Sequence, residues 1–189
     1  MKKESIRKNM LAARNALTQQ QRKNNSRLMW QHLIKTESYQ KADILFTYIS
    51  VKSEAETTPF LEQVWADGKK IAVPITEKNR KMEFVFLNTL EELTQRKWGI
   101  PEPEKQNSTS AFPTEKSLFL VPAVAVDTKG GRIGYGGGYY DTYFSKRKNG
   151  LKMGFVFFAQ IAENLKMEPT DVLLDGMVTE KGVYFFEKD

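Results

Sequence analysis

The residues of this 189-residue chain with the clearest chemical potential lie in one stretch, "GGRIGYGGGYYD", at 130–141. Six of the nine residues from 130 to 138 are glycines, and Arg132, two tyrosines and Asp141 frame them. Glycines let successive backbone N–H groups approach an anion, and the start of a helix adds partial positive charge. The stretch therefore predicts a phosphate-binding loop, with a mobile surface turn as the alternative.

This loop differs from the common phosphate loops. No Gly-Lys-Ser/Thr closes it, so it is not a Walker A motif, and Tyr139 stands where a dinucleotide fingerprint has its third glycine. Asp141 falls in the first turn of the helix that follows. A carboxylate there could bind Mg²⁺ beside phosphates or could complement the helix N-terminus, and the sequence leaves both open.

A second candidate feature is a cationic stripe near the N-terminus. Residues 1–30 carry a net charge of +7, which leaves −1 for the rest of a chain whose net charge is +6. At helical spacing, Lys3, Arg7 and Arg14 form one stripe between apolar residues, whereas Lys8 points away from them. Such a stripe could hold an anion against the protein, or its stems could simply cover apolar surface.

The elements expected to position these residues alternate between helix and strand. The periodicity predicts helices over 3–17, from a Thr18/Gln21 capping box to about 35, over 58–68 and over 139–148, and strands at 43–50, 70–75, 82–88, 117–127, 152–158 and around Gly182. This order indicates one domain, residues 1–189, with a mostly parallel central sheet in a three-layer α/β/α sandwich. Ligands bind beyond the carboxyl ends of such strands, where the glycine-rich stretch would follow Asp127.

The composition excludes several kinds of site. The chain has no cysteine, which rules out disulfides, thiolate metal sites and cysteine nucleophiles. His32 is the only histidine, so neither a histidine-based triad nor a histidine-rich metal site is possible, and we interpret it as structural. No stretch is typical of a signal peptide or a membrane span. We therefore expect a cytoplasmic protein without a membrane partner.

Five motifs in order along the chain resemble the 5-formyltetrahydrofolate cyclo-ligase family, also called methenyltetrahydrofolate synthetase. They are "KESIRK", "SEAET" (53–57), "KWGIPEP" (97–103), "VPAVAVDTKGGRIGYGGGYYD" (121–141) and "EPTDVLLD" (168–175). The resemblance implies a three-layer α/β/α fold. It also implies that ATP and Mg²⁺ drive the conversion of 5-formyltetrahydrofolate into 5,10-methenyltetrahydrofolate, ADP and phosphate. In that reaction the formyl oxygen is phosphorylated and N10 then closes the ring.

The resemblance also implies roles for matching positions. The implied ATP-binding residues are Lys3, Arg7, Arg132, Ile133, Gly134, Tyr135, Gly136, Gly137, Gly138, Tyr139 and Tyr140. The implied folate-binding residues are Val51, Glu56, Trp98, Tyr135, Gly136, Gly137, Gly138 and Tyr139. We expect Arg132 to steady the transferring phosphoryl group and Tyr139 to lie near the formyl group as the catalytic pair. The implied magnesium ligands are Asp141 and Asp171, with Asp175 as an alternative to the latter.

The loop differs from some members of the family at Tyr135 and Gly137, where they carry a basic residue. Arg14 is a candidate for the phosphate contact that this change removes. Two rival functions remain at this point: a sugar-phosphate isomerase or CoA-transferase relative, and a nucleic-acid-binding module that uses the basic N-terminal arm. The resemblance favours a monomer that binds ATP and a folate, with or without a polyglutamate tail. It favours no nucleic-acid partner.

Overall fold

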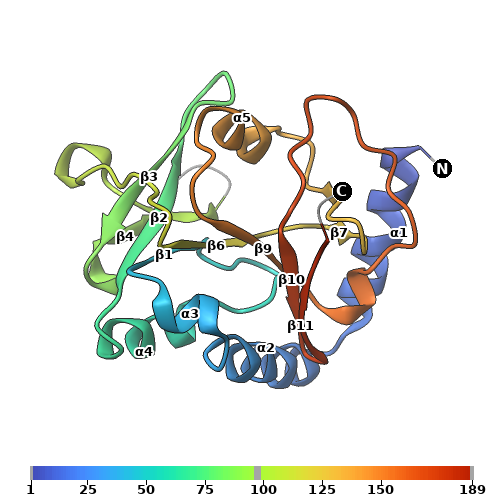
Figure 1. Cartoon of the computed structure of the whole chain (residues 1–189), viewed down its shortest axis with the longest axis horizontal. Helices are drawn as coiled ribbons and strands as arrows, with labels where there is room; N and C mark the ends of the chain where they lie inside the picture. Colours follow the sequence, from blue (N-terminus) through green and yellow to red (C-terminus); the bar gives the residue numbers. More distant parts are fainter. Residues whose placement is uncertain (1, 96–98, 188–189) are drawn as a thin grey trace.

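The computed structural model describes residues 2–95 and 99–187, and its centre is a seven-stranded sheet (Figure 1). The strand order is β11-β10-β9-β6-β1-β2-β3. Neighbouring strands run parallel except at the two edges, where β3 and β11 are antiparallel. The bounds are β1 (Ile44–Phe46), β2 (Lys70–Thr76), β3 (Met82–Leu87), β6 (Ser117–Val121), β9 (Leu151–Phe155), β10 (Gly176–Thr179) and β11 (Gly182–Phe185). The predicted mostly parallel sheet is confirmed.

Helices cover both faces of this sheet, so the predicted three-layer sandwich is also confirmed. On one face lie α2 (Gln19–Leu33), α3 (Glu37–Lys41) and α4 (Leu61–Ala66), and on the other lies α5 (Tyr139–Lys146) (Figure 1). Each face has its own buried cluster: Leu45, Val73 and Leu120 pack with α2 and α4, and Phe46, Phe84 and Phe119 pack with α5. The alternation of these side chains along the strands divides the core into two layers.

Local signals in the sequence account for several helix ends. Thr18 and Gln21 form the expected capping box at the start of α2. Pro59 lies in the short 3₁₀ helix η1 (Thr58–Phe60), which leads into α4. Gly68 follows α4 with φ +75°, a conformation that glycine adopts without strain. No described helix is long and apolar enough to cross a membrane.

The predicted strand at 117–127 is wrong in its second half. Strand β6 ends at Val121, just before Pro122, which has no N–H to continue a ladder. The chain then forms β7 (Ala125–Val126), which pairs antiparallel with β8 (Arg132–Ile133) in a separate two-stranded sheet. The first part of the glycine-rich stretch is therefore a hairpin. The strand predicted at 43–50 is also shorter, because Ser50 and Thr57 bond to each other's backbone N–H groups instead of extending the ladder.

Asp127 organises the turn of the β7–β8 hairpin. Its Oδ1 accepts from the backbone N–H groups of Lys129 and Gly131, and its Oδ2 accepts from the N–H of Leu165. A Cβ on Gly131 would come within 2.8 Å of the Asp127 carboxylate. Gly130 adopts φ +84° and packs on the backbone of Leu174. These two glycines therefore serve the turn and leave four for the exposed loop.

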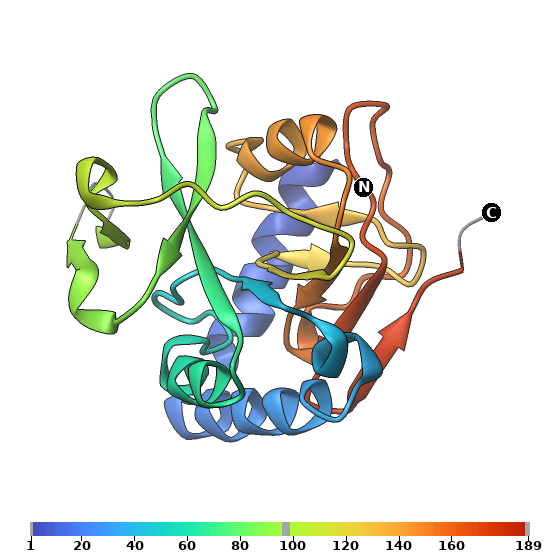
Figure 2. The ribbon, with the colours of Figure 1, turned by 60° about the vertical axis from the view of Figure 1, so that its left-hand side comes forward.

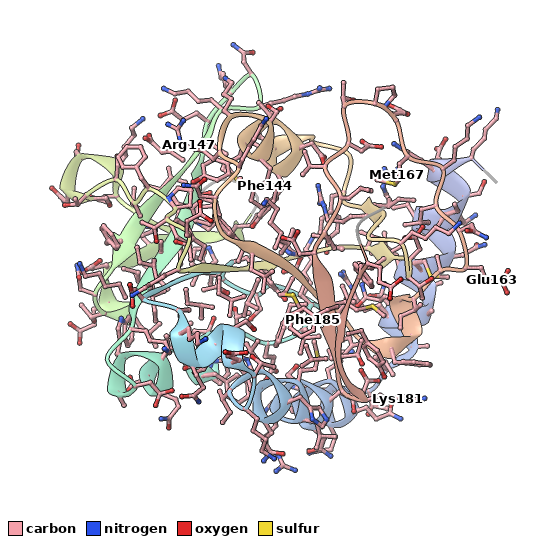
Figure 3. All side chains as sticks on the ribbon, viewed as in Figure 1. Phe144, Arg147, Glu163, Met167, Lys181 and Phe185 are labelled. Atoms are coloured by element: carbon pink, nitrogen blue, oxygen red, sulfur yellow. The ribbon has the colours of Figure 1, made fainter. Side chains whose placement is uncertain are left out.

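Helix α1 (Lys3–Ala16) lies at one end of the sheet, next to β7 (Figures 1 and 2). A small third cluster packs α1 against the β7–β8 hairpin. In it, Ile6 contacts Ala125, Ile133 and Leu165. Figure 3 shows Met167 beside α1 and Glu163 at the periphery. Three 3₁₀ helices complete the described elements: η2 (Leu90–Glu92), η4 (Lys105–Asn107) and η5 (Phe158–Gln160), of which η5 contacts α1. The strands β4 (Leu93–Gln95) and β5 (Pro101–Pro103) pair with each other in a separate ladder.

Candidate functional site

The cationic stripe on α1 faces the exposed part of the glycine-rich loop, residues 134–138. Arg7 Nε donates to the carbonyl oxygen of Gly134 at 2.9 Å, and Arg14 Nη2 donates to the Tyr135 hydroxyl at 2.7 Å. One turn before Arg7, Lys3 Nζ bonds to Asp171 at 2.6 Å. The three cations thus lie on one side of α1, as helical spacing predicted, and contact the loop at Gly134 and Tyr135 and the neighbouring Asp171. Whether they bind an anion there stays a prediction.

Arg132 and Asp141 form an ion pair at the base of this loop. Arg132 Nη2 lies 2.9 Å from Asp141 Oδ2, and the guanidinium also stands over the Tyr140 ring, 5.6 Å from its centroid. The Arg132 side chain is only 5% exposed and that of Asp141 is 25% exposed. A phosphoryl group bound by Arg132 would therefore share this cation with Asp141.

Asp171 lies in the same corner as Asp141. The N–H of Val172, its neighbour, donates to Asp141 Oδ1 at 3.2 Å. Burial opposes ionisation of Asp171, but the N–H of Glu168 and the Lys3 ammonium outweigh it and hold the pKa of Asp171 below its usual value. The alternative ligand, Asp175, is buried at the start of β10, where its carboxylate accepts from the N–H of Lys152. Position thus favours Asp171 over Asp175 as the partner of Asp141.

The two carboxylates supply oxygen ligands of the kind that Mg²⁺ takes in proteins. Within residues 2–95 and 99–187, no group of three or more acidic or histidine side chains could hold a metal. Asp141 and Asp171 each already have a cationic partner, Arg132 and Lys3. Mg²⁺ usually takes one or two carboxylates and completes its octahedron with water and phosphate. This donor set would suit a metal that arrives with a polyphosphate.

The loop ends at the N-terminus of α5, and the first N–H groups of a helix have no partner within the helix and can bind an anion. Gly138 precedes α5 with φ +69°, and its carbonyl accepts the first helical bond from Thr142. A side chain on Gly137 would meet the Tyr139 ring at 2.8 Å. Tyr139 itself donates its hydroxyl to the carbonyl oxygen of Glu77 at 3.0 Å. It therefore anchors the β2–β3 hairpin beside the loop in this structure.

Segment 51–57 also borders the loop, and it contacts α1 through Ser53. Glu54 Oε1 accepts from the Tyr135 hydroxyl at 3.0 Å, and Oε2 accepts from the N–H of Val51. Burial raises the pKa of Glu54. Two residues on, Glu56 bonds through its backbone to Ser26 and the Trp30 indole. Among the described contacts, the half-buried Glu56 side chain makes no hydrogen bond or ion pair.

Sequence reasoning missed Glu54 and Arg80. The motif "SEAET" offered two glutamates, and only the loop geometry shows that the first one meets Tyr135. Arg80 lies in the β2–β3 hairpin, and its guanidinium would come within 3.4 Å of a Cβ on Gly138. The basic run "KNRK" between two strands was its only signal. Trp98, an expected folate contact, lies outside the described residues.

Tyr140 has a buried hydroxyl without a hydrogen-bond partner among the described residues. Burial raises its pKa, so the hydroxyl stays protonated at neutral pH. Ile133 is buried in the cluster below α1, so only its backbone can face a ligand. The structure thus brings together the expected residues of the loop, α1, Asp141 and Asp171, and adds Glu54 and Arg80 to them.

Comparisons with known sequences give one consistent result. The profile of the 5-formyltetrahydrofolate cyclo-ligase family matches residues 1–180. A Haemophilus influenzae protein named 5-formyltetrahydrofolate cyclo-ligase is 30% identical over 178 residues, which make up 92% of this chain and 95% of that protein. A Schizosaccharomyces pombe protein, named as a probable 5-formyltetrahydrofolate cyclo-ligase, is 35% identical over 147 residues and covers 70% of this chain and 72% of its own.

Solved structures agree with this result. The NMR structure of Aquifex aeolicus 5,10-methenyltetrahydrofolate synthetase matches with a TM-score of 0.86 at 28% identity and covers 100% of this chain and 95% of that one. A Mycoplasma pneumoniae 5,10-methenyltetrahydrofolate synthetase has a TM-score of 0.77 at 21% identity, with coverage of 95% and 99%, and supports the fold alone. Together with the profile match over nearly the whole sequence, these relatives show that the chain belongs to the 5-formyltetrahydrofolate cyclo-ligase family.

Proposed function

We propose that the chain converts 5-formyltetrahydrofolate into 5,10-methenyltetrahydrofolate and uses Mg-ATP, with release of ADP and phosphate. Family membership supports the folate reaction. The observation that carries the use of two ligands is the position of the glycine-rich loop. The loop lies beside the cations of α1 and the Arg132–Asp141 pair, and its Tyr135 also meets Glu54. Because most residues of this loop are glycines, two substrates could approach its backbone closely enough to react with each other.

On the nucleotide side, the loop and α1 would bind the polyphosphate of ATP. The free N–H groups at the start of α5 and the side chains of Lys3, Arg7 and Arg132 supply positive charge. A bound Mg²⁺, held by Asp141 and Asp171, would supply charge neutralisation for phosphoryl transfer. Phosphoryl transfer depends on positioning and charge neutralisation more than on covalent help from the protein, and these residues provide both.

On the folate side, we assign Glu54 as the carboxylate that accepts from a pterin, because its side chain meets the loop at Tyr135. A carboxylate can receive two parallel N–H bonds from a 2-amino heterocycle. Both Glu54 oxygens already accept one hydrogen bond within the protein, so a pterin would use the second lone pair of each oxygen. Glu56, the residue first expected in this role, stays an alternative on the same segment. Val51 borders the segment, and Trp98 would add a stacking surface.

The chemistry needs little beyond these parts. A formamide carbonyl is a poor electrophile, and transfer of the γ-phosphoryl group to the formyl oxygen makes its carbon reactive. The N10 amine then attacks that carbon and loses its proton to solvent, and the C–O bond breaks with the oxygen leaving on phosphate. Because attack is intramolecular, the protein mainly has to position its ligands. We place Arg132 at the phosphoryl group and Tyr139 near the formyl group.

The test is a mixture of the purified chain, Mg-ATP and 5-formyltetrahydrofolate, followed by the absorbance of the methenyl product and by ADP. We expect one ADP for each product and no product when ATP or Mg²⁺ is omitted. Lys8→Met, which removes an exposed cation from the outer face of α1, is the matched control and should stay active. Product formation without ATP, or none with it, would contradict the proposal.

The nucleic-acid alternative has less support. Lys3, Arg7 and Arg14 turn toward the protein's own loop and Asp171, so they are poorly placed for a polyanion on the outside of α1. We therefore propose that the partners of this site are small molecules, and that the protein acts as a cytoplasmic monomer.

A further inference from the structure

Arg14 is a buried cation that the proposed ATP site does not use. It is 3% exposed and lies on the side of α1 that faces the loop. Its Nε donates to Ser53 Oγ at 3.0 Å and its Nη2 donates to the Tyr135 hydroxyl at 2.7 Å. No ion pair joins Arg14 to an acidic side chain within residues 2–95 and 99–187. Since burying a cation without a counter-charge is unfavourable, this arrangement calls for an explanation.

The acidic group nearest to Arg14 in this network is the Glu54 carboxylate, which is linked to Arg14 through the Tyr135 hydroxyl. The Tyr135 hydroxyl accepts a hydrogen bond from Arg14 and donates one to Glu54 Oε1 at 3.0 Å. The Arg14 guanidinium also stands over the Tyr135 ring, 5.6 Å from its centroid. Arg14, Tyr135 and Glu54 thus form a relay, which we call the Arg14 relay, between α1, the glycine-rich loop and segment 51–57.

A second set of hydrogen bonds holds the same segment at Ser53, next to Glu54. Ser53 Oγ, which accepts from Arg14, donates to Asn15 Oδ1 at 2.6 Å. One guanidinium therefore contacts two elements that are 82 residues apart in sequence, at Ser53 and Tyr135. Its planar fork suits this task, because the directions of its donors are fixed relative to each other.

We propose that Arg14 is a positioning residue for the folate side of the site, acting through Tyr135 and Ser53 to hold Glu54 against the glycine-rich loop. This inference rests on the proposed function, because it assigns Glu54 to the folate. Under this proposal Arg14 supports the loop through Tyr135, in place of the phosphate contact for which it was a candidate. Arg7 and Lys3 remain on the nucleotide side.

The relay predicts an asymmetric kinetic effect. Arg14→Met keeps the buried stem and removes the donors, so Glu54 loses its alignment while the contacts of Arg7 and Lys3 stay in place. We expect the KM for 5-formyltetrahydrofolate to rise about tenfold, the change that corresponds to one charge-assisted hydrogen bond. The KM for ATP should change by less than about twofold. Arg14→Lys, which can contact only one of the two elements, should fall between Arg14→Met and the wild type.

A double-mutant cycle separates the relay from general damage. Tyr135→Phe removes only the hydroxyl, and Tyr135 is 54% exposed at the loop tip, so this variant should fold normally. If Arg14 acts through that hydroxyl, the double variant should have about the same KM for the folate as the worse single variant. If the two effects multiply, or if both KM values and kcat change alike, the positioning role is contradicted.

Two controls distinguish failure of the Arg14 relay from failure of the proposed function. Lys8→Met carries the same loss of charge on the exposed face of α1 and should leave both KM values unchanged. A wild-type chain that makes no methenyl product would refute the proposed function itself. An active wild type with a normal Arg14→Met would instead refute the Arg14 relay alone.

Discussion

The Arg132–Asp141 pair offers a prediction in which stability and catalysis change differently. Arg132→Met removes a cation whose side chain is 5% exposed and leaves the Asp141 charge without its partner. Loss of one member of a buried ion pair costs about 3–5 kcal/mol, and the 25% exposure of Asp141 lowers this to about 2 kcal/mol. For a chain of this size, the melting temperature should fall by about 4–8 °C.

The second variant restores the balance of charge. Asp141→Asn in the Arg132→Met background removes the unpaired carboxylate but keeps an oxygen for the Val172 N–H. Thermal unfolding should then recover more than half of the loss, since a neutral replacement of a buried pair is often well tolerated. Turnover should stay at least about a hundredfold below the wild type in both variants, because the phosphoryl group has lost its cation. An Arg132→Met protein with wild-type melting and near-normal turnover would refute this reasoning.

Three further predictions test other parts of the site. Glu54→Gln should raise the KM for the folate more than tenfold and Glu56→Gln should raise it little. Because burial raises the pKa of Glu54, the wild-type KM should increase as pH falls through that raised value and the carboxylate becomes protonated, and a flat profile would count against this role. Arg80→Gly should raise the melting temperature by about 1–2 °C, since Arg80 adopts φ +58°, while the KM for ATP rises severalfold; lower stability would contradict it. Asp171→Asn should raise the Mg²⁺ concentration needed for activity, whereas Asp175→Asn should mainly lower stability, and equal effects would reject the assignment.

Much of the fold could be predicted because its signals are local. The alternation of helices and strands and the Thr18/Gln21 capping box are readable in the sequence, and the structure has them. The break after β6 was missed because an apolar run with one proline looks like a continuous strand. The pairing of β7 with β8 depends on the Asp127 turn, which joins residues that are distant along the chain, including Leu165.

The same distinction between local signals and long-range contacts holds for the candidate site. The stripe of Lys3, Arg7 and Arg14 followed from helical spacing, and the structure has the three side chains on one side of α1. The partners of those cations could not be predicted, because each contact joins α1 to a loop more than 30 residues away. Glu54 was missed for this reason: nothing in "SEAET" distinguishes it from Glu56 until the Tyr135 hydroxyl is placed.

The central claim is that both substrates meet at the glycine-rich loop, where the γ-phosphoryl group passes directly to the formyl oxygen. The most direct measurement uses 5-formyltetrahydrofolate labelled with ¹⁸O in the formyl group, with Mg-ATP and the wild-type chain. After one turnover, mass spectrometry of the inorganic phosphate should find the label there, since the oxygen leaves on the phosphoryl group. Unlabelled phosphate, with the ¹⁸O found in water, would contradict the account.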